Sequence, residues 1–143
     1  MNKSELSLEL KQLLDRYGNC EECKQIMTDF NWCHECNVKR FQEKFSNWTS
    51  GNDDIDKFIR ETQLSAKHHF NILEWISYER FRDIKYIAKG GFGKVYRAKW
   101  KDGYIFMWDK KIQNWGRIQS DKLVALKSLD NSKNFTSQFI KEV

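Results

Sequence analysis

The sequence predicts an α+β fold in two parts, a helical N-terminal region with a small four-cysteine knuckle followed by a twisted antiparallel sheet. Apolar residues recur at helical spacing up to about residue 66, and all four cysteines fall within residues 20–36. From about Phe81 the pattern changes to strand-like runs around a glycine-rich loop. We therefore expect a helical segment with a cysteine module at 1–66, a linker at 67–80 and a second domain at 81–143.

Composition and charge set only wide limits on the class of protein. The 143 residues are 40% apolar and carry 25 basic and 20 acidic side chains, a formal net charge of +5. That mild excess would suit an anionic partner but identifies none. No apolar run approaches the length of a membrane span, and the N-terminus has no continuous apolar segment of the signal-peptide type. We expect a cytoplasmic protein with no membrane contact.

Three helices are expected before residue 67. The first covers residues 5–17, with Ser4 as its cap and Gly18 at its end. The second carries the stripe of apolar residues in VKRFQEKFSNW: Val38, Phe41, Phe45 and Trp48. The third begins at Asp53 or Asp54 and runs to about Ala66, with its inward face formed by Ile55, Phe58 and Ile59.

The second domain reads mainly as strands. FRDIKYIAKGG and GKVYRAKW are strand-like runs joined by the glycine loop, and LVALKSL is a further strand. The last ten residues, NFTSQFIKEV, return to helical spacing. A sheet followed by one helix is therefore expected here.

The four cysteines form two CxxC pairs separated by nine residues. Two thiolates of one CxxC turn can hold one ion, and two such turns complete a tetrahedron, which favours structural Zn²⁺ with iron as the lesser alternative. The ligands would be Cys20, Cys23, Cys33 and Cys36. His34 lies inside the second pair as an alternative ligand. Redox dithiols and two disulfides are the competing interpretations.

Basic and aromatic residues follow the second cysteine pair. Lys39, Arg40 and Lys44 alternate with Phe41 and other aromatics, a mix that also occurs in nucleic-acid-binding helices. A helix with one buried and one solvated face has the same composition. We prefer the second interpretation, and nucleic acid is not an expected partner.

The stretch IAKGGFGKVYRA, residues 87–98, has the composition of a phosphate-binding loop. Phosphate is held by converging backbone amides, and glycine leaves them open to the ligand. Alone, the run fits a tight β-hairpin turn equally well. Two downstream features add weight to the phosphate interpretation: Lys127 ends the strand-like run VALK, and Glu142 shares a helical face with Phe135 and Phe139. Such a carboxylate needs a cation. Lys127 is the candidate, although Glu142 at the chain end could instead be solvent-exposed.

With these three motifs in order, residues 81–143 resemble the start of the N-terminal lobe of a eukaryotic protein kinase, with a truncated helix C. GGFGKVY and VALK are most similar to the serine/threonine kinases of the tyrosine-kinase-like group. The resemblance implies ATP as ligand. It implies that the loop residues Gly90, Gly91, Phe92 and Gly93 cover the phosphates, and that adenine is enclosed by Ile87, Val95 and Ala125. It also implies that Lys127 holds the α- and β-phosphates and that Glu142 holds Lys127.

Two departures from the family pattern stand out. Ala88 occupies the position of the first glycine of the loop, where its methyl and its aversion to positive φ are expected to weaken nucleotide binding. The segment between Ala98 and Val124 is longer than a minimal hairpin and rich in aromatics. We interpret it as an extended hairpin with cross-strand aromatic pairs. The alternative is a docking surface for a protein partner over residues 100–115.

The sequence thus predicts an ATP-binding kinase N-lobe with an N-terminal zinc module. The alternatives are a non-catalytic zinc-dependent adaptor and a nucleic-acid-binding zinc protein. The family's catalytic-loop motif H-R-D-x-x-x-x-N and its metal-binding D-F-G do not occur in these 143 residues. Mg²⁺ is expected only together with the C-terminal lobe that carries them. The resemblance therefore implies either a fragment of a full kinase or a truncated product.

We predict that these 143 residues alone do not transfer phosphate, because an aspartate beside the acceptor hydroxyl and the Mg²⁺ ligands are needed. Incubation with radiolabelled ATP should leave the chain and a generic substrate unlabelled. Transfer that the Lys127→Ala variant abolishes would contradict the prediction.

Overall fold

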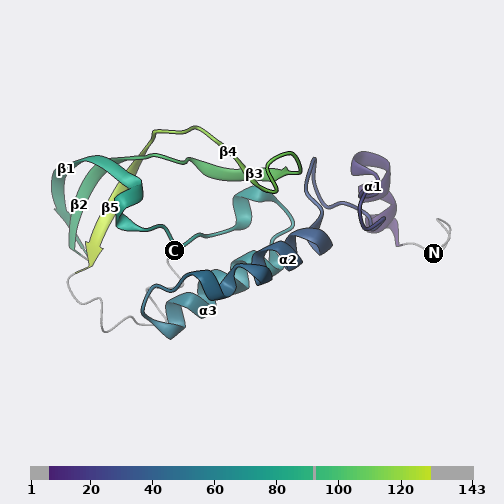
Figure 1. The fold of residues 1–143 in the computed structure, drawn as a ribbon, viewed down its shortest axis with the longest axis horizontal. Helices are drawn as coiled ribbons and strands as arrows, with labels where there is room; N and C mark the ends of the chain where they lie inside the picture. Colours follow the sequence, from purple (N-terminus) through teal and green to yellow (C-terminus); the bar gives the residue numbers. More distant parts are fainter. Residues whose placement is uncertain (1–6, 92, 130–143) are drawn as a thin grey trace. The chain divides into compact units, whose positions relative to one another are not determined.

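The computed structural model describes residues 7–91 and 93–129, and it confirms an α+β chain with antiparallel sheets. Expectations for Ser4, Phe92, the last helix and Glu142 fall outside these residues. The described chain forms two compact units (Figure 1). Unit 1 takes in the described residues up to Trp75 together with Ile105–Gly116. Unit 2 takes in Ile76–Tyr104 and the described residues from Arg117 onward.

Unit 1 contains the three α-helices of the described residues, α1 (Leu8–Tyr17), α2 (His34–Glu43) and α3 (Asp53–Ser65). Short 3-10 turns follow at Phe45–Asn47 and His69–Asn71. Helices α2 and α3 lie side by side in the ribbon (Figure 1). No helix among the residues described is both long and apolar enough to cross a bilayer.

The start of α1 differs from the expectation, whereas its end agrees. Ser7 caps the helix, its hydroxyl accepting from the Leu10 amide at 3.2 Å, so the helix begins three residues later than expected. Gly18, with φ of 76°, ends it and donates to the Leu14 carbonyl at 2.9 Å. No α1 residue is buried, and Leu8 is 72% exposed. The apolar stripe of this helix therefore contributes no core.

Helix α2 begins inside the second CxxC pair, earlier than its apolar stripe suggested. Cys33 is its N-cap, and its sulfur accepts from the Cys36 amide at 3.5 Å. The helix ends at Glu43, so Phe45 lies in the following 3-10 turn and Trp48 in extended backbone. The cap is a cysteine where Ser or Asp is usual, which explains why no clear start signal could be recognised in the sequence.

Helix α3 matches the expected segment, and a buried carboxylate fixes its first turn. Asn52 is the N-cap, accepting from two backbone amides of the first turn at 2.9 and 3.1 Å. Asp56 is only 4% exposed and accepts from the Thr49 hydroxyl at 2.5 Å, the Ser50 amide at 2.8 Å and the Ser50 hydroxyl. The loop before the helix is thus tied to the helix itself.

The core of unit 1 is aromatic and includes a distant hairpin. Strands β3 (Tyr104–Asp109) and β4 (Asn114–Ile118) form this two-stranded sheet. Its Trp115 stacks on Phe41 and on Trp32, with ring centroids 4.5 and 5.9 Å apart. The buried cluster consists of Trp32, Phe41, Ala66, Ile105 and Trp115. Burying one such aromatic side chain contributes roughly 4–6 kcal/mol before entropic costs.

The extended hairpin expected between Ala98 and Val124 is therefore present, and its aromatics are covered by the chain itself. Trp108 and Trp115, on the two strands, make an edge-to-face pair at 5.2 Å. All aromatic side chains between residues 100 and 115 are buried or half-buried. A protein partner at this segment stays a prediction. No pattern in the sequence indicated that the hairpin belongs to the helical unit.

Unit 2 is built on an antiparallel sheet in the order β1-β2-β5, preceded by a 3-10 turn at Tyr78–Arg80. The strands are β1 (Phe81–Gly90), β2 (Gly93–Trp100) and β5 (Lys122–Leu129), close to the expected runs. One face buries Ala98 and Trp100, which are 0% and 8% exposed. Gly103, with φ of 72°, leads into β3, and a Cβ there would lie 2.0 Å from the Ile118 carbonyl oxygen.

We predict that Asp56→Asn lowers the free energy of unfolding by about 1–2 kcal/mol at neutral pH, because an amide cannot accept all three hydrogen bonds. Burial opposes the charge, but the Ser50 and Thr49 hydroxyls, the Ser50 amide and Arg60 hold the pKa of Asp56 below its usual value. A lowered folded pKa stabilises above the unfolded value of about 3.9 and loses this contribution as pH falls.

Urea denaturation at several pH values checks this. The stability difference between wild type and Asp56→Asn should shrink as pH falls through the carboxylate's titration. Asp54→Asn is the matched control, since Asp54 lies exposed in the same helical turn. Equal destabilisation by both substitutions would contradict the role of the buried carboxylate.

Candidate functional site

The first CxxC turn is closed by short-range backbone contacts. Asn19 and Ile26 form an isolated antiparallel bridge that encloses it. The Lys24 amide donates to the Cys20 carbonyl at 2.9 Å, and the Cys20 amide donates to the Gln25 backbone carbonyl at 2.8 Å. Lys24 has φ of 66°, which reverses the chain directly after Cys23. The turn therefore presents both of its sulfurs to the same side.

The two CxxC turns bring all four cysteines together as predicted. Their sulfur atoms lie within 4.8 Å of one another, and we call this group the four-cysteine cluster. The Sγ atoms of Cys20 and Cys36 are 3.8 Å apart, and those of Cys23 and Cys33 are 3.4 Å apart. All four cysteines are free of disulfides, and Cys20 and Cys33 are buried. The cluster can hold one metal ion.

Burial and close contact give the thiols of the four-cysteine cluster different pKa values. Burial opposes ionisation of Cys20, but the backbone amides of Cys23 and Glu22 lower its pKa to about 7. Burial, together with the neighbouring Cys23 and Cys20 thiols, raises the pKa of Cys33 to about 11 despite the Cys36 amide. Burial and the same neighbours raise the pKa of Cys36 well above its ordinary value. One thiolate forms readily, whereas further thiolates need a cation among them.

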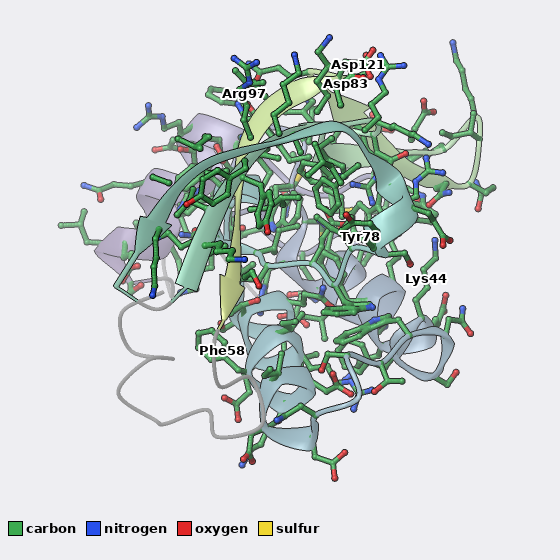
Figure 2. The ribbon with its side chains drawn as sticks, turned by 90° about the vertical axis from the view of Figure 1, so that its left-hand side faces the viewer. Lys44, Phe58, Tyr78, Asp83, Arg97 and Asp121 are labelled. Atoms are coloured by element: carbon green, nitrogen blue, oxygen red, sulfur yellow. The ribbon has the colours of Figure 1, made fainter. Side chains whose placement is uncertain are left out.

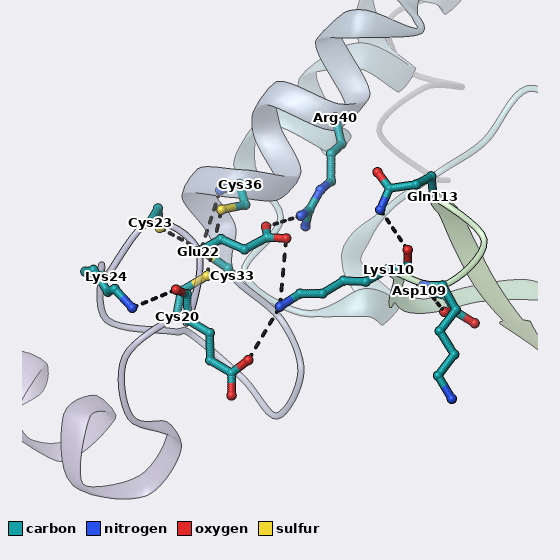
Figure 3. Close-up of polar contacts among 12 residues, drawn as sticks. Cys20, Glu22, Cys23, Lys24, Cys33, Cys36, Arg40, Asp109, Lys110 and Gln113 are labelled. Carbon is teal, nitrogen blue, oxygen red and sulfur yellow. Dashed lines mark hydrogen bonds and ion pairs between the residues drawn. The ribbon is translucent and has the colours of Figure 1, made fainter.

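Charged side chains next to the cluster link it to the β3–β4 hairpin. Lys110, at the hairpin tip, lies 3.5 Å from Glu21 and 3.9 Å from Glu22, the two residues between Cys20 and Cys23 (Figure 3). Glu22 also pairs with Arg40 of α2. The Arg40 guanidinium lies 4.6 Å from the ring centroid of Trp108. Sequence spacing could not reveal these contacts, because they join segments far apart in the chain.

Two histidines of unit 1, His34 and His68, make polar contacts outside the four-cysteine cluster. The Nδ1 atom of His34 lies 2.8 Å from the Ala66 carbonyl oxygen, which also accepts from the Trp32 indole at 3.2 Å. His34 is not among the residues whose ligand atoms converge. His68 pairs instead with Asp29 at 3.0 Å. The position of His34 therefore does not support it as an alternative metal ligand.

The residues implied for nucleotide binding lie in unit 2. Gly90 pairs with Gly93, so the glycine run closes as a tight turn between β1 and β2. Val95 pairs with Ala88 on one side and with Lys127 on the other. Ala125 pairs with Arg97. Because paired residues share a face and alternate residues on a strand do too, Val95, Ala125 and Lys127 lie on one face.

Two residues of β1, Ile87 and Ala88, differ from what the kinase resemblance implied. The register shifts between Tyr86 and Ala88, which leaves Ile87 as the extra residue, and Ile87 is 56% exposed. Ala88 has no positive φ, so the backbone strain expected from a missing glycine does not arise. Phe92 and Glu142 fall outside the described residues, and so does any contact between Glu142 and Lys127.

Comparison with known proteins adds no relative to these observations. No protein-family model, no curated protein sequence and no solved structure matches this chain.

Proposed function

We propose that the four-cysteine cluster binds one Zn²⁺ that has a structural role. The convergence of four sulfurs from two separate turns supports this proposal most strongly. A tetrahedral site with Zn–S bonds of about 2.3 Å requires sulfur–sulfur separations of about 3.8 Å. The separations of 3.8 and 3.4 Å need only small adjustments to meet this requirement.

A structural role follows from what surrounds the sulfurs. Four thiolate ligands leave no open position for a substrate or an activated water, as a catalytic zinc would need. Cys33 is the N-cap of α2, so the ion would fix the start of the helix that carries Phe41 into the aromatic core. Zn²⁺ would also offset the burial and the neighbouring thiols that otherwise raise the pKa of Cys33 and Cys36.

We propose second that unit 2 binds ATP in the manner of a protein-kinase N-lobe. The observation that favours this is the register of the sheet, which sets Lys127 opposite Val95 and on one face with Ala125. A cation beside a small apolar surface matches the phosphate and base ends of a nucleotide. Lys127 is exposed, so its ammonium group is accessible to an anion. The kinase resemblance rests on the sequence motifs alone.

For zinc we predict one equivalent per chain by elemental mass spectrometry after purification without added metal. Cys36→Ser should bind zinc far more weakly, and a strong chelator should remove the helical circular-dichroism signal of unit 1, since metal binding is coupled to folding. His34→Ala is the matched control and should retain the metal. Well under one equivalent in the wild-type chain would contradict the proposal.

For the nucleotide we predict that Lys127→Ala weakens ATP binding about tenfold, the effect of losing one charge-assisted phosphate contact. Isothermal titration with ATP measures it. Lys94→Ala removes an exposed cation from the opposite face of β2 and should leave the affinity unchanged. Equal affinities for the two variants would exclude a phosphate contact by Lys127.

A further inference from the structure

The positive charge of the chain is concentrated in unit 2. Its described residues include 11 Lys or Arg and four Asp or Glu, whereas those of unit 1 include 11 and 13. The overall charge of +5 is therefore the sum of a slightly acidic unit 1 and a strongly basic unit 2. A concentration of this size attracts anionic partners to a particular part of the molecule.

Within unit 2, part of this charge gathers on the sheet face that does not bury Ala98. Arg97 pairs with Lys85 on β1, and Lys99 and Lys127 lie on the same face by strand alternation and pairing. We call this surface the basic face, formed by Lys85, Arg97, Lys99 and Lys127. All four side chains are exposed, and Figure 2 shows Arg97 extending away from the ribbon.

The basic face is hollowed and has an apolar border. Lys85, Arg97, Lys99, Asp83 and Leu123 line a cavity of about 430 Å³. Asp83 is the only acidic residue of that lining, and it lies 3.4 Å from Lys99. Leu123, the pairing partner of Lys99, is 59% exposed. Cations thus lie along β1 and β2, and an exposed aliphatic side chain lies beside them on β5.

We propose that the basic face docks an extended acidic peptide segment in which acidic and aliphatic side chains alternate. Arg97 and Lys99 are two residues apart on one strand, a spacing of roughly 6.7 Å. Alternate side chains of an extended peptide have the same spacing. Carboxylates on one side of such a peptide would meet Lys85, Arg97 and Lys99, while its aliphatic side chains would meet Leu123. These peptide contacts use Lys85, Arg97 and Lys99 and not Lys127, so the proposal does not rest on ATP binding.

The composition of the face favours a peptide over other polyanions. Single-stranded nucleic acid is bound largely by stacking on aromatic rings. The aromatic residues of β1 and β2 with assigned partners, Tyr86 with Tyr96 and Phe81 with Trp100, lie on the opposite face. Membrane binding usually adds a large exposed apolar surface, whereas among the described residues that line the hollow Leu123 is the only apolar one.

The test uses the full zinc-loaded chain and a fluorescein-labelled octapeptide of alternating glutamate and leucine. Fluorescence anisotropy should detect binding that weakens with salt, and a glutamine-leucine peptide should not bind. The double variant Lys85→Glu, Arg97→Glu should bind the peptide about tenfold more weakly, because two ion pairs become repulsive.

The matched control is the double variant Lys89→Glu, Lys94→Glu. These two lysines are also exposed cross-strand partners on β1 and β2, but they lie on the opposite face. The control changes the net charge equally and should retain peptide affinity within about twofold. Circular dichroism and thermal melting verify that both variants are folded.

Three results would overturn the proposal. The first is no measurable binding of the glutamate-leucine peptide. The second is an equal loss in both double variants, which would show general attraction to unit 2 without a docking face. The third is tighter binding of a 15-nucleotide single-stranded RNA, or of phosphatidylserine vesicles, with the same dependence on Lys85 and Arg97.

Discussion

Trp115 stacks on Phe41 with a ring-centroid distance of 4.5 Å, and the organisation of unit 1 depends on this contact. Without it, Phe41 and Trp32 would be exposed to water on the side that the hairpin now covers. Phe41 is carried by α2, which starts at Cys33. The aromatic core and the four-cysteine cluster therefore share one helix, and loss of order in either one weakens the support of the other.

Local signals in the sequence predicted most elements of the fold. Gly18, the acidic start of α3 and the glycine turn after β1 are encoded within a few residues, so their positions were close to correct. Long-range contacts were not predictable in this way. The membership of Trp115 in the helical core depends on a fold-back that no local pattern specifies. The burial of Asp56 was missed because a carboxylate in a first helical turn normally faces water.

The two candidate sites differed in how far the sequence could define them. Spacing alone identified all four cysteines, because each CxxC turn places its sulfurs locally and only one fold-back is needed. The face shared by Val95, Ala125 and Lys127 required the strand register, which became known only with the structure. The cationic neighbours Lys85 and Arg97 could not be assigned to that face from sequence, because the irregular register of β1 obscures the alternation.

The chain passes between the two units three times, after Trp75, after Tyr104 and after Gly116. Neither unit is therefore a contiguous stretch of coding sequence. A single recombination event near residue 75 would separate the helices of unit 1 from the tryptophan that completes their core. We therefore expect the two units to be inherited together as one block. A search for the cysteine pairs alone would then be a poor way to find the same fold in other proteins.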